Sequence, residues 1–273
     1  MITYNHEQYI AQAIEGVLMQ KTNFPIEFII SNDASTDDTA RIIQNKINNL
    51  PKNIQVKYLS HKTNIGMMQN YLFALKNCTK KYVALCEGDD YWTDENKLQR
   101  QFDLLEHDAL AGGIFHLTYL INDDGTKSIL AKNTKCLLNI EDVFSKYSLF
   151  HTSSLVFRNE IDFPEQFWKS VSWDMAFFSL VSTIGYLKKI PECMSVYRKH
   201  NKSITSGDVV IQNFRKERVH LMRLLDIYHG YKYHKIIDEI IQYHQSYLKH
   251  RNLKNSAFSF LRRRIIPLFK MKP

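Results

Sequence analysis

Two adjacent carboxylates, Asp89 and Asp90, directly follow a short apolar run and are the residues best suited to chemistry. Neighbouring carboxylates repel each other unless a cation joins them. Hard divalent ions such as Mg²⁺ and Mn²⁺ prefer oxygen ligands and commonly bridge carboxylates to phosphates. The pair therefore indicates a divalent-cation site for a phosphorylated ligand. An ordinary acidic turn is the alternative explanation for the same two residues.

A third carboxylate, Asp33, lies between an apolar run and Ser35, a residue type that commonly caps helices. Helix capping does not require Asp33, because this residue lies on the strand side of the cap. A carboxylate in this place could accept a hydrogen bond from a nucleobase N–H group. A turn without function explains Asp33 about as well.

The elements that must position these carboxylates alternate between strand and helix. Apolar runs over 26–30, 54–58 and 82–86 predict strands, and helical spacing of apolar residues predicts helices after Asn5, Ser35 and Gly66. Asn5 and Ser35 are the expected caps of the first two helices. This alternation indicates an α/β fold, a mostly parallel sheet flanked by helices. Ligands bind beyond the carboxyl ends of such strands, which is where the three aspartates fall.

The second half of the chain carries a different pattern. Residues 113–121 and 127–130, separated by a turn at Asp123-Asp124-Gly125, predict a β-hairpin. Further strands are expected over 151–157 and 186–190, around a helix over 174–183. From residue 209 the sequence predicts helix almost to its end.

Composition limits the class of protein. Hydrophobic residues make up 44% of the 273 residues, which supports a folded core. No run of eighteen apolar residues predicts a membrane-spanning helix, and no charged-then-apolar leader opens the chain. The four cysteines lack metal-site spacing and suit a reducing compartment. We therefore expect a cytoplasmic protein.

Four short motifs occur in one order along the strand–helix pattern: Thr3-Tyr4-Asn5, Ser31 to Thr39, Asn64-Ile65-Gly66 and Glu87-Gly88-Asp89-Asp90. In this order they resemble the bacterial family 2 glycosyltransferases of the GT-A (Rossmann-like) fold, over residues 1 to about 200. The resemblance implies an inverting enzyme that moves a sugar from a nucleotide-sugar donor to a hydroxyl of a glycan or lipid-linked acceptor. It also implies a role in the synthesis of bacterial surface polysaccharide.

The resemblance implies roles for individual residues. Contacts to the nucleotide-sugar donor are expected from Thr3, Tyr4, Glu7, Asp33, Asn64, Asp89 and Arg198. The expected ligands of a Mn²⁺ or Mg²⁺ ion are Asp90, Asp89 and His200. Because Asp33 occupies the place of the residue that reads the base, a UDP-sugar is the first expectation for the donor.

The catalytic base implied by the resemblance is Asp174, which follows Trp173 at the start of a predicted helix. An acceptor hydroxyl is a poor nucleophile until a side chain takes its proton. The alternative is that Asp174 only stabilises the helix N-terminus, by about 0.3–1 kcal/mol. The expected acceptor contacts are Trp173, Trp168, Thr152 and Ser153.

Three positions depart from the family pattern. Asn32 replaces the first aspartate of a usual pair, and Glu87 stands where many relatives have aspartate. We expect Glu87 to reach a metal-bound water and not the ion itself. Only Met1 and Ile2 precede Thr3, so the first strand is expected to be short. Either Met1 is internal to a longer chain, or the first strand is truncated and the protein is less stable.

The net charge of +8 lies entirely at the end of the chain, where residues 249–273 contain eight basic residues and no acidic one. Apolar residues alternate with these cations, which predicts a basic amphipathic tail. Such a tail fits attachment to an anionic membrane surface, each cation contributing about 1 kcal/mol. The expected location is then peripheral, on the inner face of the cell membrane. A solvated helical cap is the alternative.

We expect a glycosyltransferase domain over 1–205, with a nucleotide-sugar half of about 1–110 and an acceptor half of about 111–205, followed by a helical extension over 206–273. A sugar nucleotidyltransferase is a rival enzyme class, but residues 3–7 contain no glycine for a phosphate loop. A non-enzymatic membrane- or nucleic-acid-binding protein acting through the tail is the second rival. Acidic residues on the sheet rim suit nucleic acid poorly, so no nucleic-acid partner is expected.

Overall fold

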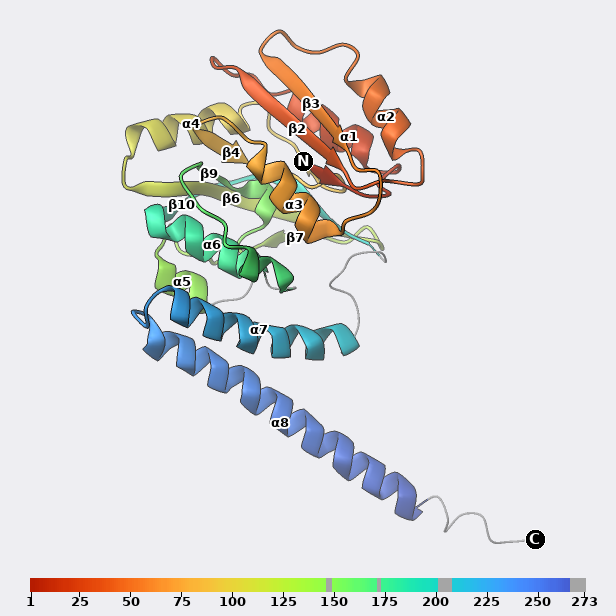
Figure 1. Ribbon diagram of the computed structural model, residues 1–273, viewed down its shortest axis with the longest axis vertical. Helices are drawn as coiled ribbons and strands as arrows, with labels where there is room; N and C mark the ends of the chain where they lie inside the picture. Colours follow the sequence, from red (N-terminus) through yellow and green to blue (C-terminus); the bar gives the residue numbers. More distant parts are fainter. Residues whose placement is uncertain (146–148, 171–172, 201–207, 266–273) are drawn as a thin grey trace, which may run out of the picture. The chain divides into compact units, whose positions relative to one another are not determined.

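The computed structural model describes residues 1–145, 149–170, 173–200 and 208–265 (Figure 1). The chain forms two compact units. The first comprises Met1–Lys169 and Trp173–Ile204, and the second comprises Ser170–Ser172 and Thr205–Pro273. Among the described residues, none of the helices combines the length and the apolar character needed to cross a membrane.

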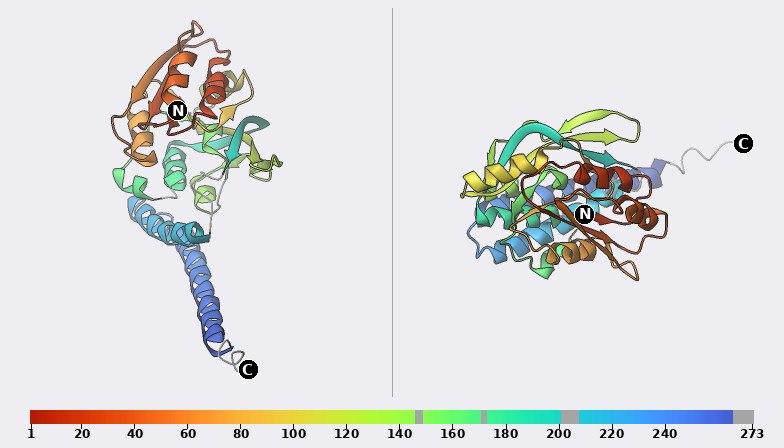
Figure 2. Two further views of the ribbon diagram at one scale, coloured as in Figure 1. Left: turned by 90° about the vertical axis from the view of Figure 1, so that its right-hand side faces the viewer. Right: turned by 90° about the horizontal axis from the view of Figure 1, so that it is seen from above.

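A three-stranded parallel sheet opens the first unit, in the order β1 (Ile2–Thr3), β2 (Ile26–Asn32), β3 (Ile54–Ser60). Helices α1 (Ile10–Leu18) and α2 (Thr39–Lys46) lie on one face of this sheet, and α3 (Met67–Lys76) lies on the other (Figures 1 and 2). Apolar residues at helical spacing line the buried side of α1, and β2 is buried from Phe28 to its end. This packing confirms the expected strand–helix alternation.

The two expected helix caps are wrong. Helix α1 begins at Ile10 and α2 begins at Thr39, several residues after Asn5 and Ser35. Asn5 has a φ of 53°, a left-handed conformation that asparagine tolerates. Asn5 Oδ1 accepts a hydrogen bond from the Thr36 backbone amide at 2.8 Å. The Asn5 backbone amide donates to Ser35 Oγ at 2.9 Å. Both residues therefore join the loops that follow β1 and β2, because tertiary partners outcompete local capping.

A second, seven-stranded sheet has the order β4 (Tyr82–Ala84), β9 (Val156–Arg158), β6 (Ala111–Asn122), β10 (Tyr186–Lys199), β5 (Tyr91–Trp92). Strand β7 (Lys127–Leu130) pairs with β6, and β8 (Leu137–Leu138) pairs with β10. Strands β6 and β10 are parallel, whereas the other neighbouring strands of this sheet are antiparallel. The β6–β7 pair confirms the expected hairpin, and β10 extends well past the expected strand over 186–190.

Five further helical elements complete the first unit. They are α4 (Lys97–His107), α5 (Ile140–Ser145), the 3₁₀ helices η1 (Thr152–Ser154) and η2 (Glu165–Lys169), and α6 (Trp173–Ile184). Because η1 occupies residues 152–154, the strand expected from residue 151 begins only at Val156. The α/β class with sheets flanked by helices, predicted from the sequence, is confirmed.

The second unit contains the helices α7 (Asp208–Tyr228) and α8 (His234–Ile265), which pack against each other. The turn between them includes Gly230 at a φ of 59°. Helix was expected from residue 209 onward, and these two helices confirm it. The side chains of residues 250–265 and all of residues 266–273 lie outside the described part of the chain, and most of the predicted basic tail falls there.

Candidate functional site

The loop between β4 and β5 carries Glu87, Gly88, Asp89 and Asp90 and meets the end of β1. The Gly88 amide donates to the Ile2 carbonyl at 2.9 Å. A Cβ atom on Gly88 would lie 2.7 Å from Thr3 Oγ1, closer than real Cβ atoms approach. Glycine at this position therefore allows the acidic loop and the first strand to come together.

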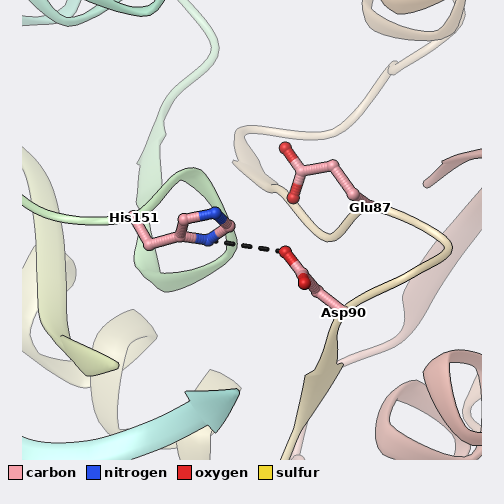
Figure 3. Close-up of side chains that lie close together, drawn as sticks. All are labelled: Glu87, Asp90 and His151. Carbon is pink, nitrogen blue, oxygen red and sulfur yellow. Dashed lines mark ion pairs between the residues drawn. The ribbon is translucent and has the colours of Figure 1, made fainter. Parts of the chain in front are cut away.

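Three of the residues around this loop form a cluster suited to a divalent cation. One ligand atom each from Glu87, Asp90 and His151 lies within 4.8 Å of the other two. Figure 3 shows the His151 ring facing the Asp90 carboxylate, with Glu87 on the neighbouring side. His151 Nδ1 is 3.6 Å from Asp90 Oδ2. The two carboxylates suit Mn²⁺ or Mg²⁺, and an imidazole is a ligand of transition metals.

The electrostatics of the cluster fit a bound cation. Glu87 Oε2 is buried and has no hydrogen-bond partner among the described residues. Burial, with the Asp89 charge contributing, raises the pKa of Glu87 to about 7. Burial and the charges of Asp89 and Glu87 also raise the pKa of Asp90, which is only 1% exposed. Burial lowers the pKa of His151 to about 4, so its ring is neutral and able to bind a metal. A cation would offset the cost of ionising both carboxyl groups here.

Asp89 has different neighbours from Asp90. Its Oδ2 lies 3.2 Å from His200 Nε2 and 3.8 Å from His6 Nε2. The ligand set expected from the sequence was Asp89, Asp90 and His200, whereas the structure places Glu87 and His151 around Asp90. From the sequence, Glu87 was expected at a metal-bound water and residue 151 at the start of a strand. With eleven histidines in the chain, no sequence signal singled out His151 or His6.

Arg198, near the end of β10, holds the acidic loop in place. Its amide donates to Asp90 Oδ1 at 2.9 Å, and its Nη1 donates to the Asp89 carbonyl at 2.6 Å. The guanidinium lies over the ring of Tyr91, 4.3 Å from its centre, and near Tyr9 at 5.3 Å. The structure therefore brings Arg198 to the carboxylates, and its contact with the donor stays a prediction. A fixed guanidinium here is suited to a donor phosphate.

Asp33 lies at the end of β2 and is 1% exposed. Its Oδ1 accepts from the Ile65 amide at 2.7 Å and its Oδ2 from the Gly66 amide at 2.9 Å. Asn64 Nδ2 donates to the Asp33 carbonyl at 3.3 Å. The structure thus brings Asp33 and Asn64 together, with Asp33 holding the turn before α3. Each carboxylate oxygen still has a second lone pair, and the contact to a nucleobase stays a prediction.

The residues of the first turn have mixed surroundings. Thr3 is buried, with Oγ1 3.2 Å from His6 Nδ1. Tyr4 is 42% exposed, so its ring is accessible. Glu7 Oε2 accepts from the Asp38 amide at 3.1 Å, just before α2. Donor contacts by these residues stay predictions, and Glu7 has a structural role in addition.

Asp174 is the second residue of α6, and its Oδ1 accepts from the Met175 amide at 2.9 Å. The neighbouring Trp173 packs on Tyr71, with ring centres 4.4 Å apart. Burial, followed by the Glu87 charge, raises the pKa of Tyr71 well above its ordinary value. Tyr71 therefore packs beside the start of α6, next to Trp173.

The two tryptophans expected at the acceptor are 3% and 8% exposed. Trp168 and Trp173 stack with ring centres 5.5 Å apart and an angle of 20°. They share an aromatic cluster with Tyr71, Phe163 and Phe177. In this conformation their faces are covered by protein, so an acceptor could stack on them only if the cluster opened. The sequence showed the two indoles but not the rings that cover them.

Thr152 and Ser153, also expected at the acceptor, point into the protein. Thr152 Oγ1 donates to Glu87 Oε1 at 2.6 Å. Ser153 Oγ lies 2.8 Å from His151 Nδ1 and 3.3 Å from Ser195 Oγ. These hydroxyls orient two members of the candidate cation cluster, and acceptor contacts by them stay predictions.

Glu87→Gln is expected to stabilise the cation-free protein more at pH 8 than at pH 5. Glu87 ionises near pH 4.5 in the unfolded chain and near pH 7 in the folded one. The protonated, buried carboxyl group makes its full contribution to the stability of the fold below pH 4.5. This contribution is lost as the pH rises through 7. Glutamine keeps an acceptor for Thr152 without ionising. Thermal unfolding should show that the gain in Tm of Glu87→Gln over wild type is about 3 °C larger at pH 8 than at pH 5.

The matched control is Glu95→Gln, an exposed carboxylate paired with Lys21. It should show no such pH-dependent gain, and Mn²⁺ at pH 8 should stabilise wild type more than Glu87→Gln. An equal gain for Glu87→Gln at both pH values would contradict the buried, proton-binding state of Glu87.

The two sheets flanked by helices have the GT-A fold. The family model described as "Glycosyl transferase family 2" matches residues 1–162. This chain belongs to that family. An uncharacterized protein of Mycobacterium tuberculosis is 32% identical over 239 residues, which cover 85% of this chain and 68% of the relative.

Two solved structures have similar folds. Staphylococcus aureus TarS 1–349 in complex with UDP-GlcNAc has a TM-score of 0.57 at 18% identity, covering 81% of this chain and 64% of that chain. The mannosyltransferase PcManGT of Pyrobaculum calidifontis, in complex with GDP-Man and Mn²⁺, has a TM-score of 0.60 at 15% identity, covering 98% of this chain and 79% of that one. This chain spans less than two thirds of the TarS chain.

Proposed function

We propose that this protein is a cation-dependent, inverting glycosyltransferase that moves a sugar from a nucleotide-sugar to a hydroxyl of a glycan or lipid-linked acceptor. The observation that supports it is the cluster of Glu87, Asp90 and His151 within 4.8 Å, beside Arg198. Without a cation, ionising these buried carboxyl groups is costly, so they suit a Mn²⁺ or Mg²⁺ ion. Such an ion would in turn bind a diphosphate.

In the proposed mechanism, Glu87, Asp90 and His151 would hold the cation, with Asp89 and His200 beside it. The cation, when bound, neutralises the charge of the departing diphosphate. Arg198, which contacts Asp89 and Asp90, would bind a phosphate oxygen of the donor. Asp174 takes the proton of the acceptor hydroxyl as that oxygen bonds to the anomeric carbon and the bond from this carbon to the phosphate oxygen breaks.

A single displacement of this kind inverts the configuration at the anomeric carbon. The proposal contains one base and no covalent nucleophile, so no glycosyl-enzyme intermediate forms. Product analysis tests this step: a nucleoside diphosphate and an inverted linkage are expected. Release of pyrophosphate would instead indicate a nucleotidyltransferase.

A UDP-sugar is the first donor to test. The similar TarS structure contains UDP-GlcNAc and the similar mannosyltransferase contains GDP-Man, so UDP- and GDP-sugars form the screen. The experiment is thermal unfolding with each donor, with and without Mn²⁺. A Tm rise that requires both Mn²⁺ and a UDP-sugar supports the proposal. No rise with any nucleotide-sugar would contradict it.

We further propose that the enzyme works on the cytoplasmic face of the cell membrane, in bacterial surface polysaccharide synthesis. The support is the sequence of residues 249–273, which combines eight cations with apolar residues and no acidic residue. Such a segment binds anionic lipid through charge and apolar insertion.

Deletion of residues 249–273 is expected to abolish sedimentation with vesicles that contain anionic lipid. Each basic residue near such a surface contributes about 1 kcal/mol, so the loss of eight should lower binding by at least about 100-fold. Neutral vesicles are the control and should bind both proteins weakly. Unchanged binding of the shortened protein to anionic vesicles would remove the tail from the proposal.

A further inference from the structure

Two buried side chains outside the cation cluster hold the backbone of η1. Trp92, the last residue of β5, donates from Nε1 to the Ser153 carbonyl at 2.8 Å. Gln101 of α4 donates from Nε2 to the Ser154 carbonyl at 2.8 Å and to the Ile114 carbonyl at 2.7 Å. Trp92 is 4% exposed and Gln101 is fully buried. The two side chains therefore fix consecutive carbonyls of one short turn.

A buried lysine links these two side chains. Lys97 Nζ donates to Gln101 Oε1 at 2.8 Å and lies 4.0 Å from the ring centre of Trp92. Lys97 is fully buried, and burial lowers its pKa to about 7. A side-chain amide has one oxygen and two N–H donors. Because Lys97 occupies the oxygen of Gln101, it orients the N–H donors toward the Ser154 and Ile114 carbonyls.

The bond from Trp92 also joins the acidic loop to η1. Trp92 follows Asp90 by two residues, and Ser153 follows His151 by two residues. Their hydrogen bond therefore ties the two segments together beside the place where His151 Nδ1 comes within 3.6 Å of Asp90 Oδ2 (Figure 3). A movement of η1 away from Trp92 would break this bond and separate the imidazole from the carboxylate.

We propose that Trp92 and Gln101 are positioning residues for the candidate cation site. By holding the carbonyls of η1, they keep His151 within ligand distance of Asp90 and Glu87. Neither side chain belongs to the cluster, so each acts through the backbone that carries the imidazole. The inference rests on the proposed function, because it gives the two residues a role in cation binding.

The test uses two variants that each remove the hydrogen bonds of one side chain to η1. Trp92→Phe keeps an aromatic ring beside Lys97 but lacks the indole N–H. Gln101→Glu keeps an oxygen for Lys97 but lacks the amide donors. We expect each variant to weaken Mn²⁺ binding by at least about 10-fold, because residues that orient metal ligands have effects of this size. Electron paramagnetic resonance of Mn²⁺ added to the protein alone measures the affinity.

Amide exchange without Mn²⁺ provides a second measurement. The Ser154 amide donates to the His151 carbonyl and the Leu155 amide donates to the Thr152 carbonyl, so both report on η1. In both variants we expect exchange at Ser154 and Leu155 to be at least about 10-fold faster than in wild type, because η1 opens more often. Exchange in α1 should be unchanged.

The control is Leu105→Ala, which truncates a fully buried side chain of α4 one turn after Gln101. It should lower Tm by about 5 °C or more and leave the Mn²⁺ affinity unchanged. An equal loss of affinity in this control would overturn the inference, since a general loss of stability would then explain the effect.

The outcomes also separate this inference from the proposed function. If wild type binds Mn²⁺, and Trp92→Phe and Gln101→Glu bind it equally well with unchanged exchange at η1, only the positioning role is overturned. If wild type binds no Mn²⁺, the proposed cation site and the positioning role both fail.

Discussion

Asp90→Asn is expected to lower turnover by about 1,000-fold while the protein remains folded. Asp90 is almost fully buried, faces His151 and lies within the candidate cation cluster. Asparagine keeps an oxygen that can accept from the Arg198 amide, which Asp90 Oδ1 accepts at 2.9 Å. The substitution therefore removes the negative charge and one strong cation ligand but not the bond that holds the loop.

The stability of the variant separates its catalytic from its structural effect. Burial raises the pKa of Asp90, so the ionised carboxylate is costly to the cation-free fold. Asp90→Asn should have a Tm equal to or above that of wild type without Mn²⁺, and it should lose the Tm rise that Mn²⁺ causes. The control is Asp103→Asn, an exposed aspartate of α4 bonded to Gln99. Near-normal turnover and a normal Mn²⁺ response in Asp90→Asn would contradict the assignment of this site.

Asp174→Asn is expected to reduce kcat by about 10²- to 10⁴-fold, the range that a positioned general base contributes. Asparagine can still accept from the Met175 amide, which Asp174 Oδ1 accepts at 2.9 Å, so the start of α6 should remain intact. Donor binding should survive, because the base acts on the acceptor and not on the nucleotide-sugar. Steady-state kinetics and donor-induced thermal shift measure these two effects separately.

The matched control for Asp174→Asn is Asp162→Asn, an exposed aspartate before η2. It should leave kcat unchanged. If the kcat of Asp174→Asn stays near that of wild type, another residue is the base and Asp174 serves only the N-terminus of α6.

The strands and helices of the nucleotide-sugar half follow from local patterns. The apolar run before Glu87 and the alternation of strand and helix required no knowledge of distant contacts, because strand and helix periods are properties of short segments. Parallel strands end at one edge, so the positions of Asp33, Asp89 and Asp90 near a common rim followed from the same pattern. The first residues of α1 and α2 could not be predicted from this pattern. Asn5 and Ser35, the expected caps, instead form hydrogen bonds between the loops that follow β1 and β2.

The partners of the carboxylates depended on pairing between distant strands. Strand β10 lies between β6 and β5, which carries Arg198 to Asp90. The turn η1 carries His151 to the same carboxylate and Thr152 to Glu87. No spacing in the chain links these residues, because they meet only when the second sheet forms.

The burial of these side chains also could not be predicted from the sequence. The sequence predicted that Trp168 and Trp173 contact an acceptor. In the structure, the rings of Tyr71, Phe163 and Phe177 pack against them. The residue types and the acidic rim were thus readable from local order along the chain. The cation cluster and the covered indoles arose from packing, because each depends on atoms that approach one another only in three dimensions.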